Sequence, residues 1–459
     1  MRNILSAIVI SILFLNFLSN AQNITNTLPT NGSFKVKDNT NEFLSVDQVT
    51  GNLKLFRNLV LPISSQTTGA IYIGTNRILN TYGVNNLFWG SNSGNFTLNS
   101  SISRENVAIG SNTMKSLTTG YENTAVGSSA LSEVTTGKYN SAFGSISLMK
   151  NTTGENNSAF GYATLNQNTT GYGNSAFGWA VLYANTEGHD NTAFGNVALN
   201  KNTTGFFNSA FGMNALRNNT TGDENSAFGQ ASLFNNISGY SNTAIGVLAL
   251  TGNTIGNLNT AIGYSSGSSI TTGSNNITIG YDAQVPINTG SNQIRIGNAS
   301  IGYAGVQVAW SVTSDRRWKE NIKETNLGLE FISKLNPVSY TRINDTSHKL
   351  EYGLIAQELE EVLKSEGMEN TGMLNIADDG YYELRYNDLL APMIKAIQEL
   401  KAENEKLRTE KSTEVAQLKK ENLSIRQELE LFKEMQVRLT KLEQEIKNSD
   451  VKFSSNIIK

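Results

Sequence analysis

The sequence predicts a multidomain chain: a β-rich N-terminal region, a β-solenoid of 17-residue repeats, a small α+β domain and a C-terminal coiled coil. Three observations support this fold class. Glycines recur every 17 residues from Gly110 to Gly297, charged residues become frequent after residue 300, and apolar residues recur every seven positions from Leu390. A chain of 459 residues is also too long for one compact domain.

Residues 1–21 have the pattern of a secretory signal peptide. Arg2 supplies positive charge, Ile4–Phe17 is apolar, and Ser19-Asn20-Ala21 resembles a cleavage site after small residues. The apolar stretch is shorter than the ~20 residues that span a bilayer, and we expect no membrane span once the signal is removed. The pattern therefore predicts a secreted or cell-surface protein.

Residues 22–105 are less regular and predict a β-rich cap or attachment region, because the ends of a solenoid need covering. We expect strands at Phe34–Val36, Leu53–Phe56 and Ala70–Ile73, which are short apolar runs bounded by turn residues.

Residues 106–300 hold the repeat, which is clearest in Asn140-Ser141-Ala142-Phe143-Gly144 and its copies. A second glycine series, from Gly120 to Gly290, keeps the same period. Self-similarity over so many copies indicates a solenoid. Seventeen residues suit one coil with two short strands and two glycine turns.

Neighbouring residues of a strand face opposite sides, so Ala142 and Phe143 cannot both point into a thin coil. One member of each such pair needs a cover outside the coil, and a laterally packed copy of the same chain is the simplest cover.

The repeat resembles the left-handed parallel β-roll heads of trimeric autotransporter adhesins, which carry a similar Asn-Ser-small/apolar-Ile-Gly core. The resemblance covers residues 106–297 and implies a trimeric left-handed β-roll. The strict 17-residue period, and Phe at many sites where that family favours Ile or Val, depart from its pattern. Aromatic residues at variable turns leave a surface glycan or a protein ligand open, although repeat packing explains them at least as well.

Composition argues against several function classes. The net charge of -3 gives no basic surplus for binding nucleic acid. The absence of cysteine excludes disulfides, thiolate catalysis and cysteine-based zinc sites. Calcium-binding solenoids need regular aspartates, whereas the repeat has only Asp190, Asp223 and Asp282. We expect neither a cofactor nor a metal.

Charge density changes near residue 300. Residues 101–300 contain 7 Lys/Arg and 9 Asp/Glu, whereas residues 301–459 contain 23 and 27. We expect a linker at 301–313 and an α+β domain at 314–389. The expected helices lie around Leu327–Leu335 and Ala356–Leu363, and the expected strands are Val338–Ile343, Tyr352–Ile355 and Tyr381–Arg385.

Residues 390–447 predict a coiled coil, followed by a flexible tail at 448–459. The first seam has a seven-residue period and contains Leu390, Ile397, Asn404, Lys411, Leu418, Ile425, Phe432, Leu439 and Ile446. The second seam turns polar in its middle. The heptads alone do not decide between a trimer and a dimer.

A serine and a lysine open the α+β domain five residues apart, at Ser314 and Lys319, a spacing suited to self-cleavage. A serine hydroxyl is a poor nucleophile until a base takes its proton, and a lysine serves as that base where desolvation disfavours its ammonium form. An alternative is a helix N-cap at Ser314-Asp315 followed by a solvated basic turn. We do not expect a Ser-His-Asp triad, because only His189 and His348 exist.

The segment 314–390 resembles the intramolecular chaperone and autoprocessing domain of phage tail spikes and endosialidases. The residues that carry the resemblance are Ser314-Asp315 with Lys319 and Ile322, then Leu335-Asn336-Pro337-Val338, then Tyr352-Gly353-Leu354-Ile355-Ala356-Gln357-Glu358.

This resemblance implies that Ser314 is the nucleophile, Lys319 the base and Thr313–Ser314 the bond that is cut. Asp315, Gly353 and Gln357 are candidate supporting residues.

The whole arrangement resembles exported tail-fibre-domain proteins of Gram-negative bacteria. The function so implied is that of an exported homotrimeric fibre or adhesin-like protein. Its chaperone drives assembly through the β-roll and the coiled coil, and then cuts the chain once as a Ser-Lys serine peptidase, not as a turnover enzyme. Two alternatives stay open: a surface adhesin that keeps an uncleaved, inert stalk, and a polysaccharide-acting enzyme like some tail spikes. The repeat shows no positioned acidic pair for the latter.

Overall fold

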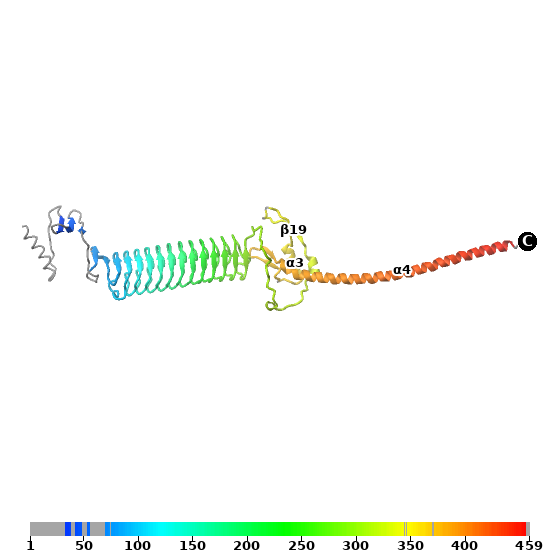
Figure 1. Ribbon diagram of the computed structural model, residues 1–459, viewed down its shortest axis with the longest axis horizontal. Helices are drawn as coiled ribbons and strands as arrows, with labels where there is room; N and C mark the ends of the chain where they lie inside the picture. The colour runs from blue at the N-terminus through cyan, green and yellow to red at the C-terminus, as the bar shows by residue number, and fades with distance from the viewer. Residues whose placement is uncertain are drawn as a thin grey trace, which may run out of the picture. The chain divides into compact units, whose positions relative to one another are not determined.

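The structure is a computed structural model that describes residues 33–37, 42–47, 53–55, 69–73, 75–343, 345, 347–369 and 371–455 (Figure 1). The expected signal peptide at 1–21 lies outside the described residues. The chain divides into two units, Met1–Thr204 and Gly205–Lys459, so that the division falls within the repeat.

The N-terminal region of the first unit is built from short antiparallel strands. Strands β1 (Ser33–Lys37), β2 (Glu42–Asp47) and β3 (Leu53–Leu55) form a three-stranded sheet in that order. Strand β4 (Ile71–Ile73) pairs with β5 (Asn76–Asn80), and β5 pairs with β6 (Leu87–Trp89). The three strands expected here are confirmed, whereas β2, β5 and β6 were not anticipated.

The repeat forms a β-solenoid of about 12 turns, with one short strand in each coil. Each strand pairs in parallel with the strand of the next coil, so that Ala142 lies opposite Ala159 and Phe143 opposite Phe160. In the first unit the stack runs from β6 through β7 (Val107–Ile109), β8 (Thr124–Val126), β9 (Ser141–Phe143), β10 (Ser158–Phe160), β11 (Ser175–Phe177) and β12 (Thr192–Phe194).

In the second unit the same arrangement continues through β13 (Ser209–Phe211), β14 (Ser226–Phe228), β15 (Thr243–Ile245), β16 (Thr260–Ile262), β17 (Ile277–Ile279) and β18 (Ile294–Ile296). The 17-residue period therefore equals the length of one coil, as expected.

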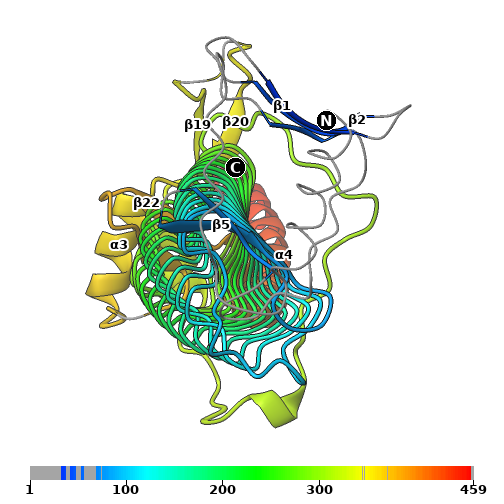
Figure 2. The same cartoon turned by 90° about the vertical axis from the view of Figure 1, so that its left-hand side faces the viewer.

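The expectation of two strands in each coil is wrong. The second half of a coil is a series of tight turns in which residues such as Ser129 (φ 57°) and Leu131 (φ 48°) adopt left-handed backbone conformations. A strand needs consecutive extended residues, so only the three residues before the first glycine form one. Figure 2 views the coils along the stacking direction.

Small side chains and asparagines fill the interior of the coils. Ala142, Ala159 and Leu148 are completely buried. Asn157 donates from Nδ2 to Asn140 Oδ1 at 3.1 Å and accepts the backbone N–H of Asn174 at 3.1 Å. This pattern repeats along the stack, so each buried amide satisfies a neighbour in the next coil.

The phenylalanines of the strands lie on the outside of the coils, where they stack on one another. The ring centroids of Phe143 and Phe160 are 4.8 Å apart, and those of Phe160 and Phe177 are 4.6 Å apart. Phe143 still exposes 37% of its surface. As expected, only one member of each Ala-Phe pair faces inward. The structure shows that this member is the alanine and that the phenylalanine stays partly exposed.

Downstream of the solenoid the chain forms a small α+β body and one long helix. The elements are η1 (Arg316–Trp318), α2 (Leu329–Lys334), β19 (Val338–Tyr340), β20 (Glu351–Gly353), α3 (Ala356–Ser365), β21 (Leu374–Ile376), β22 (Tyr382–Leu384), η2 (Tyr386–Leu389) and α4 (Leu390–Ser455). The expected helices and strands are present, although their ends differ by a few residues, and β21 was missed. The core consists of Leu327, Phe331, Leu359, Leu363, Met373 and Leu389.

Helix α4 has 66 residues and leaves its apolar seams uncovered. Ile397 is 65% exposed and Ile425 is 61% exposed. The helix extends through Ser455, into the range expected as a flexible tail. In the parts of the chain that the structure describes, no helix has the length and apolar character needed to cross a membrane.

Candidate functional site

The predicted serine–lysine pair lies at the start of the α+β body, on either side of the single turn η1. Lys319 donates from Nζ to Ser314 Oγ at a distance of 2.6 Å. Ser314 follows the segment 301–313, in which the structure places neither a helix nor a strand. The predicted pair is therefore in direct contact.

A short capping arrangement makes this contact. Asp315 is the N-cap of η1, and its carboxylate accepts the backbone N–H of Arg317 at 2.8 Å. At the other end, the N–H of Lys319 donates to the carbonyl of Arg316 at 3.1 Å. Because the chain turns once between these two bonds, it brings Lys319 back to Ser314. The N-cap that sequence analysis offered as an alternative thus occurs together with the Ser–Lys contact, with Asp315 as the capping residue.

The carboxylate of Asp315 is engaged by Arg317. The guanidinium Nη2 of Arg317 lies 2.7 Å from Asp315 Oδ2. The side-chain hydrogen bond from Arg317, followed by its backbone hydrogen bond, lowers the pKa of Asp315 below its usual value. The same contact raises the pKa of Arg317. Asp315 is therefore ionised at neutral pH and contributes to the shape of the turn.

The pair is open to water in the single chain. Thr313, Ser314 and Lys319 are all exposed. Two large apolar side chains close to them in the sequence are exposed as well: Trp310 shows 76% of its surface and Trp318 shows 82%.

The other two candidate residues lie elsewhere in the α+β body. Gly353 ends β20, where the N–H of Leu354 donates to the Tyr386 hydroxyl at 3.0 Å. A Cβ on Gly353 would collide with that hydroxyl, so glycine permits the close approach of Tyr386. Gln357 is exposed in the first turn of α3. Within the described residues, no hydrogen bond joins Gly353 or Gln357 to the Ser–Lys pair.

One contact important for this body was missed by sequence reasoning. The N–H of Leu329, at the start of α2, donates to Glu399 Oε2 of α4 at 2.7 Å. The two residues are 70 positions apart, so no local sequence pattern indicates the contact. It ties the α+β body to the first turns of the long helix.

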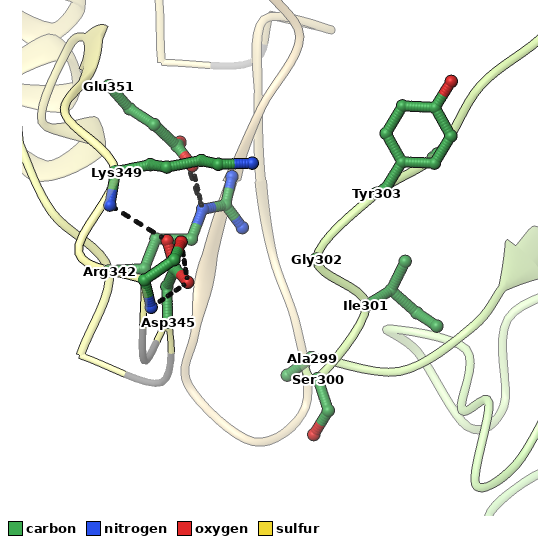
Figure 3. Close-up of a pocket in the computed structure, with 11 residues that line it drawn as sticks. Ala299, Ser300, Ile301, Gly302, Tyr303, Arg342, Asp345, Lys349 and Glu351 are labelled. Atoms are coloured by element: carbon green, nitrogen blue, oxygen red, sulfur yellow. Dashed lines mark hydrogen bonds and ion pairs between the residues drawn. The ribbon is translucent and has the colours of Figure 1, made fainter.

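A polar cleft of 440 Å³ lies between the segment Ala299–Ala304 and the loop that joins β19 to β20 (Figure 3). Arg342 Nε donates to Glu351 at 3.1 Å, a hydrogen bond that raises the pKa of Arg342. Asp345 accepts the backbone N–H groups of Ser347 and Lys349. These groups satisfy one another, and Ser314 and Lys319 do not line the cleft. In the described part of the chain, no group of three or more His, Asp or Glu side chains could hold a metal ion.

Residues 314–368 match the Peptidase_S74 family, the chaperone of endosialidase. The Peptidase_S74 segment begins at Ser314 itself and includes Lys319, Gly353 and Gln357. No curated protein and no solved structure matches the chain. The Peptidase_S74 segment and the β-solenoid together fit a tail-fibre-type protein with a chaperone domain, and they fit a trimeric assembly.

Proposed function

We propose that this protein is an exported homotrimeric fibre whose Peptidase_S74 segment drives assembly and then cuts the bond between Thr313 and Ser314. The observation that carries the proposal is the 2.6 Å contact between Lys319 Nζ and Ser314 Oγ, at the first residue of the matched segment. A nucleophile and a base within hydrogen-bond reach are the minimum that covalent catalysis requires.

The proposed reaction consumes one water molecule and leaves two chains. Ser314 Oγ attacks the carbonyl carbon of Thr313 while Lys319 Nζ takes the hydroxyl proton. The C–N bond then breaks, the Ser314 nitrogen receives the proton from Lys319, and Thr313 is held as an ester on Ser314 Oγ. Water hydrolyses this ester, which gives a Thr313 carboxylate and restores the Ser314 hydroxyl.

Assembly is the proposed trigger for this reaction. A hydrated lysine keeps its proton in neutral water, so it becomes a base only where its surroundings disfavour the ammonium form. Ser314 and Lys319 are exposed in the single chain, and so are Trp310 and Trp318, which are close to them in the sequence. We infer that neighbouring chains cover this segment in the trimer and exclude water from the pair, so that cutting follows correct association.

Two uncovered apolar surfaces support association of the chain with its own copies. One is the outer row of stacked phenylalanines on the coils, and the other is the seam of α4, where Ile397 and Ile425 are more than half exposed. Because both surfaces recur at fixed intervals along the chain, parallel copies can cover them in register. Cutting after such assembly makes dissociation slow. The chains are then kept from separating and pairing again out of register.

The proposal is tested with the chain expressed without residues 1–21. Wild type, Ser314→Ala and the matched control Ser311→Ala are compared by denaturing gel and by mass spectrometry of the fragments. We expect wild type and Ser311→Ala to give fragments 22–313 and 314–459, and Ser314→Ala to stay intact. An intact wild-type trimer would instead indicate the adhesin with an uncleaved stalk. Fragments from Ser314→Ala would exclude Ser314 as the nucleophile.

A further inference from the structure

Along one edge of the solenoid, backbone N–H groups donate to the carbonyl of the residue 17 positions later. In the second unit, Ile237 N donates to Thr254 O at 2.8 Å, Thr254 N to Thr271 O at 2.8 Å, and Thr271 N to Asn288 O at 3.1 Å. Each coil therefore uses the carbonyl of the next coil to satisfy its own N–H. The N–H of Asn288 is the next donor in this series.

Asn288 has no further coil to which it can donate, because residue 305 lies in the irregular segment after β18. Its N–H donates instead to Asp378 Oδ2 at 2.7 Å, across 90 residues. The backbone N–H of Asp378 in turn donates to the Pro286 carbonyl at 2.7 Å. The carboxylate of Asp378 thus stands where the carbonyl of a further coil would be.

Asp378 is held in this position by the turn between β21 and β22. Ala377 N donates to Tyr381 O at 2.9 Å, and Gly380 N donates to Ala377 O at 2.9 Å. The strands on either side pair in antiparallel register from Leu374 to Leu384. The hairpin therefore presents Asp378 from a closed turn rather than from a loose loop.

The interior of the last coil also changes towards the hairpin. The inward position of the strands is alanine in β15 and β16, becomes Thr278 in β17, and becomes Arg295 in β18. Arg295 Nη1 lies 2.8 Å from Glu383 Oε1 on β22. Glu383 also accepts Asn375 Nδ2 at 3.2 Å, which joins both strands of the hairpin to this contact.

We propose that the hairpin Leu374–Leu384 is the C-terminal cap of the solenoid, and that it keeps the C-terminal fragment bound to the fibre after the chain is cut. The binding partner of the hairpin is the last coil, at Pro286, Asn288 and Arg295. The retention of the fragment rests on the proposed cutting at Thr313–Ser314, whereas the cap does not. The hairpin lies outside the residues that match the Peptidase_S74 family.

Asp378 makes two of the contacts with the last coil, one through its carboxylate and one through its backbone N–H, and its side chain is exposed. A hydrogen bond to a charged group contributes more than a neutral one, and it also satisfies a backbone donor at the end of the stack. The side chains of Arg295 and Glu383 are 37% and 39% exposed, so water and salt screen their attraction. This ion pair positions the hairpin but contributes little to its binding at high salt.

The cap is tested without cutting, in the full chain carrying Ser314→Ala. Hydrogen exchange at the backbone amide of Asn288 is compared for Asp378→Ala, Asp378→Asn and the matched control Asp379→Ala. The Asp379 carboxylate bonds to the N–H of Tyr381 within its own turn. We expect Asp378→Ala to speed exchange about tenfold or more. Asp378→Asn keeps a side-chain acceptor and should have a smaller effect, and Asp379→Ala should leave exchange unchanged. Unchanged exchange in Asp378→Ala would overturn the cap.

Retention is tested on the cut wild-type protein by gel filtration in low salt. We expect the fragment 314–459 to elute with the fibre, and to separate from it about tenfold faster or more when Asp378 is alanine. Glu383→Arg should also hasten release, and Arg295→Glu combined with Glu383→Arg should restore binding. Immediate loss of the wild-type fragment would contradict retention. If the wild type is not cut, the proposed function fails, and the exchange experiment still decides the cap.

Discussion

Lys319 Nζ lies 2.6 Å from Ser314 Oγ across one turn of 3₁₀ helix, and Asp315 caps that turn. Local backbone geometry alone therefore brings the proposed nucleophile and the proposed base together. The single chain does not exclude water from the pair, because both side chains are exposed.

Removing the base should stop the self-cleavage. We expect Lys319→Met to slow cutting by roughly 10²–10⁴-fold, the usual contribution of a positioned base. Lys319→Arg should fail as well, because a guanidinium keeps its proton. The measurement is the time course of the two fragments on a denaturing gel. Lys323→Met, which removes another exposed lysine nearby, is the control and should cut normally. Wild-type cutting by Lys319→Met would contradict the assigned role.

The cap at Asp315 should affect cutting through the shape of the turn. Asp315→Asn keeps an oxygen that can accept the N–H of Arg317, whereas Asp315→Ala removes it. We expect alanine to slow cutting more than asparagine does. Equal rates for the two variants would show that the cap does not position the pair.

The pH dependence of the Asp315 contact follows from the direction of its pKa shift. The hydrogen bonds from Arg317 lower the pKa of Asp315 in the folded chain below its usual value. The stabilisation is therefore present above the unfolded value and is lost as the pH falls through the folded one. We expect wild type and Asp315→Asn to show pH–rate profiles of the same shape between about pH 5 and 8. A wild-type step in that range that is absent from Asp315→Asn would contradict this assignment.

Much of the fold could be predicted because the sequence repeats the same physical requirement in every coil. The period of 17 predicted the coil length, and the alternation in Ala142-Phe143 predicted that one residue of each pair faces outward, although not which one. The tight turns of the second half-coil could not be predicted, because Leu131 and Leu148 adopt positive φ angles that leucine rarely takes.

The contacts of the candidate site and its surroundings were also predictable only in part. The contact between Ser314 and Lys319 was predictable because it is local, and the resemblance to a known family singled it out. The contacts of Asn288 with Asp378 and of Leu329 with Glu399 were not predictable, because they join segments far apart in the chain. Tertiary packing alone brings such partners together.

The glycines that precede each turn should be sensitive to substitution. Gly161 has a φ of 132°, and a Cβ there would collide with the carbonyl of Gly178 in the next coil. We expect Gly161→Ala to destabilise the fold by roughly 1–3 kcal/mol or more. The control is Gly302→Ala, where a Cβ meets nothing within 4 Å. Urea unfolding followed by circular dichroism compares the two. Equal midpoints would contradict the close stacking of the coils.

The buried asparagines should stabilise the stack by satisfying one another. Asn157 donates to Asn140 Oδ1 and to Gly171 O, and it accepts from the backbone and the side chain of Asn174. Asn157→Ala leaves these buried groups unpaired, at about 1–3 kcal/mol each, so we expect a loss of about 3 kcal/mol or more. The control Asn218→Ala removes only a surface contact to Asn235 and should change stability by less than about 1 kcal/mol. Similar unfolding midpoints for both variants would contradict a stabilising role for the hydrogen-bonded row of buried asparagines.

Assembly through the α4 seam should be required for cutting. Ile425→Asp places a charge in the exposed apolar seam, whereas Gln427→Asp makes the same change of charge on the opposite side of the helix. We expect Ile425→Asp to remain a single, uncut chain and Gln427→Asp to behave as wild type. Efficient cutting by a monomeric Ile425→Asp variant would show that self-cleavage does not require assembly.

The most direct test is the mass of the uncut protein in solution. Light scattering during gel filtration of Ser314→Ala, expressed without residues 1–21, measures how many chains associate while the Ser–Lys pair cannot react. We predict a mass of three chains. A stable, soluble species with the mass of one chain would contradict the proposed trimer and, with it, the coupling of self-cleavage to assembly.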